Sequence, residues 1–152
     1  LKDSKSLSKS KREKLFFYIK KNSIWAIGIA SVHEIEKINI LNASLLAMKR
    51  AIKKLKKKPD LILIDGNNLP DLKNYNLKCI IKGDQKIHSI SAASIIAKVS
   101  RDRFIKKLSK KFKNYGWETN FGYGTKQHMS AIKKFGITKY HRKTFYPICK
   151  FK

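Results

Sequence analysis

Two aspartates in matching local sequences are the strongest candidates for chemistry in this chain. Asp65 and Asp84 each follow a short apolar stretch, residues 61–64 and 78–81, and each has a glycine beside it. In an open α/β sheet, ligands bind at the carboxyl ends of strands, and glycine allows a large group to approach the backbone. If the two stretches are neighbouring parallel strands, both carboxylates converge at one edge. Such a pair predicts a site for Mg²⁺ or Mn²⁺, held between the protein and substrate phosphates.

A structural role is the alternative for both aspartates, because Asp often accepts turn amides, as in an Asp-Gly step. Spacing leaves both roles open. Asp102 has an arginine on either side and is predicted to pair with one of them on a helix face. The remaining candidates, His88, His128 and His141, lack the spacing of a metal site or a catalytic triad with each other or with cysteine, and we interpret them as structural.

Tyr123 is the second candidate, because it stands between Gly122 and Gly124 and just before Thr125, a good N-cap residue. A ring in this setting can lie flat against a sugar or base while the helix amides face a phosphate. The alternative is that Tyr123 packs into a cluster with the other aromatic residues of its loop, Trp117 and Phe121.

Composition narrows the possible classes of protein. The 152 residues fit one domain, which we place at 1–152, and the 42% of hydrophobic residues suffice for a core. The 36 Lys and Arg against 10 Asp and Glu give a net charge of +26, which favours a polyanionic partner. No apolar run approaches the roughly 18 residues of a membrane span. Two cysteines, Cys79 and Cys149, are too few for a disulfide framework and indicate a reducing cytoplasm.

The elements that position these residues follow from hydrophobic spacing. Ser8 or Ser10 can cap the first helix, and Ser10 with Glu13 fits a capping box. A strand, a helix and a second strand in succession predict a βαβ unit with parallel strands. The expected helices cover 8–21, 32–55, 89–112 and 125–135, the last of which stops before Gly136, and the expected strands cover 24–30, 61–64 and 78–81.

Several stretches, in order along nearly the whole chain, resemble ribonuclease HII, the bacterial type 2 ribonuclease H. Each stretch is weak alone, but the ordered set is highly specific. They are Asp3-Ser4-Lys5-Ser6-Leu7-Ser8, Asn39-Ile40-Leu41-Asn42-Ala43-Ser44, Leu63-Ile64-Asp65-Gly66-Asn67, Lys82-Gly83-Asp84, residues 89–99 (Ser-Ile-Ser-Ala-Ala-Ser-Ile-Ile-Ala-Lys-Val), Gly122-Tyr123-Gly124-Thr125 and His141-Arg142-Lys143-Thr144-Phe145.

The resemblance implies an α/β, RNase H-like mixed sheet flanked by helices. It also implies a monomeric endoribonuclease that hydrolyses the RNA strand of RNA–DNA hybrids and cleaves at ribonucleotides embedded in duplex DNA. Two metal ions, Mn²⁺ or Mg²⁺, would leave 5′-phosphate and 3′-hydroxyl ends. By motif, Asp65 and Asp84 would be catalytic metal ligands, Tyr123 would stack on the sugar at the ribonucleotide–deoxyribonucleotide junction, and Ser4 and Lys5 would lie near a substrate phosphate.

One family feature has no counterpart in this sequence. The family's opening strand carries an Asp-Glu pair followed by Gly-Arg-Gly, which implies two further metal ligands and a sensor of the ribose 2′-hydroxyl. We expect that the first strands of the sheet are missing from this chain and that the native product is longer.

Two other functions compete with this interpretation. A non-catalytic, basic nucleic-acid-binding remnant would bind through Lys–phosphate contacts, with steep salt dependence and no preference for a ribonucleotide junction. A ribosomal-type RNA-binding protein fits the charge but does not explain Asp65 and Asp84.

With half of the carboxylates, these 152 residues alone are expected to be inactive or nearly so. Cleavage of a duplex with one ribonucleotide, followed in Mn²⁺, checks this. Turnover that disappears in Asp65→Asn would contradict it.

Overall fold

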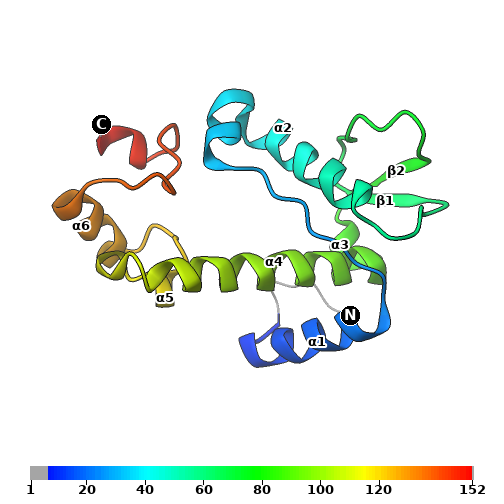
Figure 1. The fold of residues 1–152 in the computed structure, drawn as a ribbon, viewed down its shortest axis with the longest axis horizontal. Helices are drawn as coiled ribbons and strands as arrows, with labels where there is room; N and C mark the ends of the chain where they lie inside the picture. Colours follow the sequence, from blue (N-terminus) through cyan, green and yellow to red (C-terminus); the bar gives the residue numbers. More distant parts are fainter. Residues whose placement is uncertain (1–6, 152) are drawn as a thin grey trace. The chain divides into compact units, whose positions relative to one another are not determined.

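The computed structural model describes residues 7–151, which divide into two compact units (Figure 1). The first unit contains residues 7–30 and 41–99, and the second contains 31–40 and 100–151. The helices are α1 (Lys9–Asn22), α2 (Val32–Lys53), α3 (Gly83–Lys86), α4 (His88–Ser109), α5 (Trp117–Asn120) and α6 (Lys126–Phe135), with 3₁₀ turns at Lys113–Tyr115 and Ile148–Phe151; the strands are β1 (Ile62–Asp65) and β2 (Leu77–Ile80).

The sheet of the described residues consists of β1 and β2, which pair in parallel. Ile62 stands opposite Leu77 and Asp65 opposite Ile80, so the two strands end at the same edge. Ile64 of β1 is buried with Ile52 of α2. The α/β class and the two strands after residue 60 are confirmed, and the sheet seen here is parallel rather than mixed.

The first unit buries a second cluster between α1 and α4. Phe16 and Ile19 of α1 pack against three apolar residues of α4, of which Ile95 is completely buried. α1 begins where the sequence indicates, but the Ser8 hydroxyl accepts the Lys11 amide, so Ser8 rather than Ser10 is the cap. The predicted helices over 8–21 and 89–112, which form this cluster, are therefore confirmed as α1 and α4.

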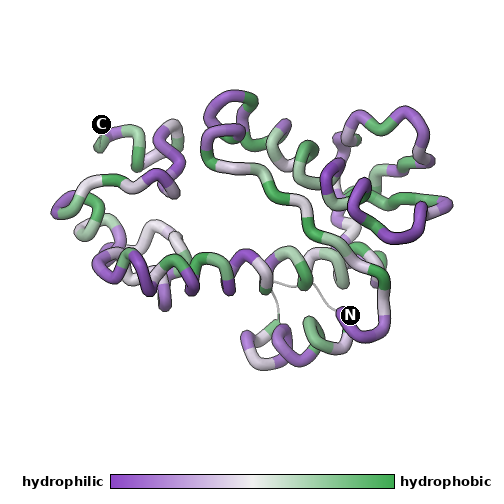
Figure 2. Tube along the Cα trace, viewed as in Figure 1, coloured by the Kyte–Doolittle hydropathy of each residue, from purple (hydrophilic) through white to green (hydrophobic). Residues whose placement is uncertain are grey.

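The predicted strand over residues 24–30 is wrong, and with it the predicted βαβ unit. This apolar segment, pale to green in Figure 2, has no regular secondary structure and joins α1 to α2. An apolar strand needs a neighbour to take its backbone hydrogen bonds. Here side chains at the C-terminal end of α2 and just beyond it accompany the segment: Arg50 Nη1 of α2 donates to the Ile29 carbonyl at 2.7 Å, and Nζ of Lys54, the residue after α2, donates to the Ile27 carbonyl at 3.4 Å.

Gly28 lets this segment lie directly on α2. A Cβ at this position would collide with the carbonyl oxygen of Ala47 and lie 2.6 Å from the amide nitrogen of Ala51. Both atoms belong to the helix backbone, which cannot move aside as a side chain can. The close approach therefore depends on glycine.

The long helix predicted over 32–55 is broken inside α2. Asn39 has φ 66° and ψ 171°, which is not helical, so two helical pieces meet at this residue. Ser31 and Glu34 cap the first piece reciprocally, since the Ser31 amide donates to Glu34 Oε2 at 2.8 Å and the Glu34 amide to Ser31 Oγ at 3.2 Å. The break lies next to the boundary between the two units. Along α2, the side chain of Ile52 is buried, whereas that of Leu41 is 48% exposed.

The second unit has its own aromatic core. Tyr115 and Trp117 stack with ring centres 5.2 Å apart and bury Ile132 of α6 beneath them. α6 begins at the predicted cap, Thr125, whose hydroxyl accepts the His128 amide. Among residues 7–151, no helix is both long and apolar enough to span a membrane.

Gly28→Ala is expected to lower the free energy of unfolding by about 3 kcal/mol, because the new methyl group meets helix backbone. Urea unfolding followed by circular dichroism measures this change. Ile29→Ala, next to it and 67% exposed, is the control and should change stability by less than about 0.5 kcal/mol. Equal stability of Gly28→Ala and the parent chain would contradict the packing described for this segment.

Candidate functional site

Parallel pairing brings Asp65 and the segment of Asp84 to one edge of the first unit. Asp65 is the last residue of β1, and its Oδ1 accepts the amide of Gly83 at 2.8 Å. Asp84, the next residue, lies in the first turn of α3 rather than directly at the end of β2. The expected convergence of the two strand ends is therefore observed, with a short helix between β2 and the second carboxylate.

Carboxylate oxygens remain available at this edge. Asp65 is exposed, and the one described hydrogen bond of its carboxylate is made through Oδ1. Asp84 is half-buried, and its carboxylate has no hydrogen bond or ion pair with any residue from 7 to 151. Within that same range, no three or more His, Cys, Asp or Glu side chains gather in a way that could hold a metal ion. Two carboxylates fit Mg²⁺, which is commonly bound by one or two carboxylates together with waters and substrate phosphates.

The two adjacent glycines serve different purposes. A Cβ on Gly66 would meet nothing within 4 Å, and its φ of +107° suits glycine, so this turn is open to an approaching group. A Cβ on Gly83 would lie 2.5 Å from Ile90 Cδ1 and 3.3 Å from Ile80 Cβ. A side chain at position 83 would therefore crowd Ile90 and Ile80, and the sequence interpretation of an open approach holds for Gly66 alone.

The backbone of Tyr123 in the second unit is fixed on both sides. Its amide donates to the Asn120 carbonyl at 2.8 Å. Its carbonyl accepts the Thr125 amide at 2.8 Å and faces His128 Nδ1 at 2.9 Å. Asn120 is itself buried, with its side chain bonded to the carbonyl of Tyr115 and to the amide of Gly122. The backbone of this loop is therefore fixed by hydrogen bonds on both sides of Tyr123.

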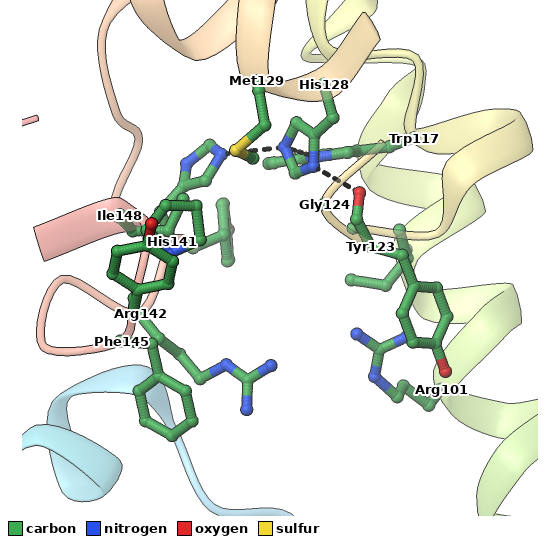
Figure 3. A pocket seen from close by; sticks show the side chains of 15 residues that line it. Arg101, Trp117, Tyr123, Gly124, His128, Met129, His141, Arg142, Phe145 and Ile148 are labelled. Atoms are coloured by element: carbon green, nitrogen blue, oxygen red, sulfur yellow. Dashed lines mark hydrogen bonds between the residues drawn. The ribbon is translucent and has the colours of Figure 1, made fainter. Parts of the chain in front are cut away.

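The ring of Tyr123 points away from this scaffold. It is 58% exposed, whereas Trp117 is 3% exposed, so the alternative in which Tyr123 packs into the aromatic cluster does not describe this structure. The ring borders a hollow of about 210 Å³, shown in Figure 3, whose wall includes Arg101 and Arg142. Ser4 and Lys5 lie outside the described residues.

Two buried histidines, His128 and His141, line this hollow. The Nε2 atoms of His128 and His141 are 3.2 Å apart, and Trp117 Nε1 donates to His128 Nε2 at 3.0 Å. The Thr138 amide donates to His141 Nδ1 at 2.9 Å. The predicted structural role fits both residues, whereas His88 is exposed at the start of α4. Asp102 lies 3.7 Å from Arg101, the pairing with a neighbouring arginine that the sequence predicts.

The direction of each hydrogen bond assigns the protons of this pair. Since an amide only donates, Nδ1 of His141 accepts, and its proton lies on Nε2, which donates to His128. His128 Nε2 also accepts from Trp117, so its own proton lies on Nδ1 and is donated to the Tyr123 carbonyl. Burial, and then repulsion by His128, lower the pKa of His141 from 6.5 to about 4, although the Thr138 bond opposes the shift.

Sequence reasoning missed this histidine pair because 13 residues separate its members. Neither a helical nor a strand period connects a residue on α6 with one in an irregular tail. The linking signal is the fold itself, which returns the tail to the start of α6.

Comparison with known proteins gives one consistent result. A family model described as ribonuclease HII matches residues 1–148. The ribonuclease HII of Pelagibacter ubique (strain HTCC1062) is 79% identical over 148 residues, which are 97% of this chain and 80% of that protein. The ribonuclease HII of Anaplasma marginale (strain St. Maries) is 49% identical, covering 97% of this chain and 61% of that one. The crystal structure of ribonuclease H2 from Pyrococcus horikoshii OT3 superimposes with a TM-score of 0.77 at 30% identity, covering 98% of this chain and 78% of that one.

The histidine pair predicts a loss of stability in acid. Unfolded His141 binds a proton near pH 6.5, whereas the folded residue resists protonation until about pH 4. Between these values the unfolded chain holds more protons, so the free energy of unfolding should fall as the pH is lowered, by roughly 3 kcal/mol from this group. Above pH 6.5 this group contributes no pH dependence.

Urea unfolding between pH 4 and 7.5 measures this effect. His141→Asn keeps an acceptor for the Thr138 amide but cannot titrate, so its acid-dependent loss should be smaller. His33→Gln, at an exposed position on α2, is the control and should keep the full loss. Parallel pH profiles for His141→Asn and the parent chain would contradict this prediction.

Proposed function

The chain belongs to the ribonuclease HII family, as the sequence resemblance predicts, and from this we propose that it acts on RNA strands paired with DNA. Membership places it among ribonucleases, while these 152 residues alone are expected to turn over little or no substrate. The proposed reaction is endonucleolytic hydrolysis of the RNA strand in RNA–DNA hybrids and at ribonucleotides embedded in duplex DNA, leaving 5′-phosphate and 3′-hydroxyl ends. Mn²⁺ or Mg²⁺, two ions per site, would activate the water and stabilise the leaving oxygen.

The observation that carries this proposal is the meeting of Asp65 and the Asp84 segment at one sheet edge. The Gly83 amide holds one oxygen of Asp65, which leaves the other for a cation. Asp84, half-buried and without a described partner, gains an interaction when a cation binds. We assign both residues as metal ligands of the catalytic centre, with substrate phosphate oxygens completing the shell.

Tyr123 is proposed to stack on the sugar at the junction between the ribonucleotide and the next deoxyribonucleotide. A ring can discriminate only if its backbone does not move, and three hydrogen bonds hold the backbone of Tyr123. The ring itself is more than half exposed and available for stacking. Ser4 and Lys5 are assigned to a substrate phosphate by motif.

The protein is proposed to act in the cytoplasm. It is proposed to act there as a monomer. Cys79 and Cys149 are free thiols, which suits a reducing compartment. The net charge of +26 supports attraction to the nucleic-acid backbone.

The metal assignment is tested by titrating the protein with Mn²⁺ and measuring the binding by isothermal titration calorimetry. Asp65→Asn and Asp84→Asn should each weaken Mn²⁺ binding by about tenfold or more, because each removes an anionic ligand. Asp60→Asn, at an exposed position before β1, is the matched control and should bind Mn²⁺ as the parent chain does. Unchanged binding in both variants would remove the metal centre from this edge.

The substrate assignment is tested by anisotropy with two duplexes that differ in one ribonucleotide. Tyr123→Ala should lose about 5- to 100-fold in affinity for the ribonucleotide duplex, the range of one stacking contact, and Tyr123→Phe should lose little. Tyr18→Ala, 67% exposed on α1, is the control and should retain the parent affinity. Equal binding of both duplexes by the parent chain, with steep salt dependence, would instead favour the non-catalytic binder.

A further inference from the structure

Two arginines face each other across the hollow beside Tyr123. Arg101 comes from α4 and Arg142 from the segment after α6, and both line the hollow. Figure 3 shows their guanidinium groups pointing toward one another from opposite walls. Like charges in this arrangement repel, so the geometry calls for an anion between them.

Arg142 lacks such an anion within the described chain. The residue is half-buried, and its guanidinium has no hydrogen bond or ion pair with any residue from 7 to 151. Burial, and then the charge of Arg101, lower its pKa, while Tyr123 acts in the opposite direction. A partly buried cation is costly unless it is paired, so this residue gains from any anion that enters the hollow.

Both guanidinium groups are held in place before an anion arrives. Arg101 Nη1 donates to the Phe121 carbonyl at 3.0 Å, and Asp102, at 3.7 Å, is its one ion-pair partner among the described residues. The Cζ of Arg142 lies 4.3 Å from the ring centre of Phe145. Next to it, the Lys143 amide is bonded to Glu36 Oε1 at 3.0 Å, which anchors the segment.

The lining of the hollow indicates the kind of anion. Planar guanidinium groups match the oxygens of phosphate, and two of them can grip one phosphate from both sides. The ring of Tyr123 borders the same hollow, with its centre 5.7 Å from Arg101 Cζ. An anion joined to a flat or sugar-like group suits this combination better than an isolated carboxylate does, and a nucleotide has this form.

We propose that Arg101 and Arg142 clamp one phosphodiester of the nucleic-acid strand whose nucleotide lies against Tyr123. The proposal rests on the proposed function, since it takes the ligand to be that substrate. It adds that two arginines bind one particular phosphate, at a defined position relative to the nucleotide stacked on Tyr123. This contact is separate from the non-specific attraction of the lysines to the nucleic-acid backbone.

The test uses the full 152-residue chain and a DNA duplex with one ribonucleotide, with binding followed by anisotropy at several salt concentrations. Arg101→Gln and Arg142→Gln should each weaken binding about tenfold and reduce the slope of log affinity against log salt by about one. Arg103→Gln, an exposed position on the same helix as Arg101, is the control for general charge loss. It should lower affinity by less than each clamp variant.

A set of duplexes, each with one phosphate replaced by an uncharged methylphosphonate, locates the clamp. At one position near the ribonucleotide, the replacement should weaken binding by the parent chain and by Arg103→Gln, but not by the Arg101→Gln/Arg142→Gln double variant. If the double variant remains as sensitive as the parent chain at every position, the clamp does not exist.

Two controls keep these outcomes separate. Thermal melting shows whether each variant folds. Where a glutamine variant does not fold, Arg142→Lys replaces it: this variant keeps the charge but lacks the planar guanidinium, so its affinity should fall by about the same factor as expected for Arg142→Gln. Preference for the ribonucleotide over an all-DNA duplex tests the proposed function. The phosphate scan tests the clamp and reads out with either duplex.

Discussion

The second unit depends on the Nε2 atom of His128, which accepts hydrogen bonds from Trp117 and from His141. With two donors on one lone pair, this nitrogen has no room for a proton, and the ring must carry its proton on Nδ1. That proton is directed at the carbonyl of Tyr123. The buried side chains of Trp117, His128 and His141 therefore fix the backbone from which the exposed ring of Tyr123 projects. Through the same nitrogen atom, α6 is hydrogen-bonded both to the aromatic loop and to the C-terminal segment.

Local signals in the sequence predicted the parts of this fold that local energetics decide. Ser8 and Thr125 cap their helices because an N-cap hydroxyl needs only its own neighbours. Gly136 ends α6 in the same way, with its amide bonded to the Ile132 carbonyl. The two strands after residue 60 and the place of Asp65 at a strand end also followed from sequence, since a strand-end carboxylate is placed by the strand itself, whereas the parallel pairing of these strands was only a condition of the prediction.

Non-local features were beyond such reasoning. Residues 24–30 have the composition of a buried strand, but a strand is defined by its partner, and here the side chains of Arg50 in α2 and of Lys54 just after it take that place. Asn39 interrupts a helix whose apolar spacing runs on without a break, and its backbone (φ 66°, ψ 171°) lies in a region that residues other than glycine rarely adopt, so no local preference of asparagine predicts the break. The meeting of His128 with His141 depends on the return of an irregular tail, which no periodicity encodes.

The neutrality of the histidine pair also bears on the charges beside it. Arg142 follows His141 directly, and Arg101 faces Arg142 across the hollow. With its pKa held near 4, His141 is uncharged at neutral pH, so a third positive charge is not added to two that already repel. The same hydrogen bonds that orient Tyr123 therefore leave Arg101 and Arg142 as the cationic side chains among the residues that line the hollow. The proposed stacking by Tyr123 and the proposed phosphate contact of the two arginines therefore share one buried support, the hydrogen-bonded group of Trp117, His128 and His141.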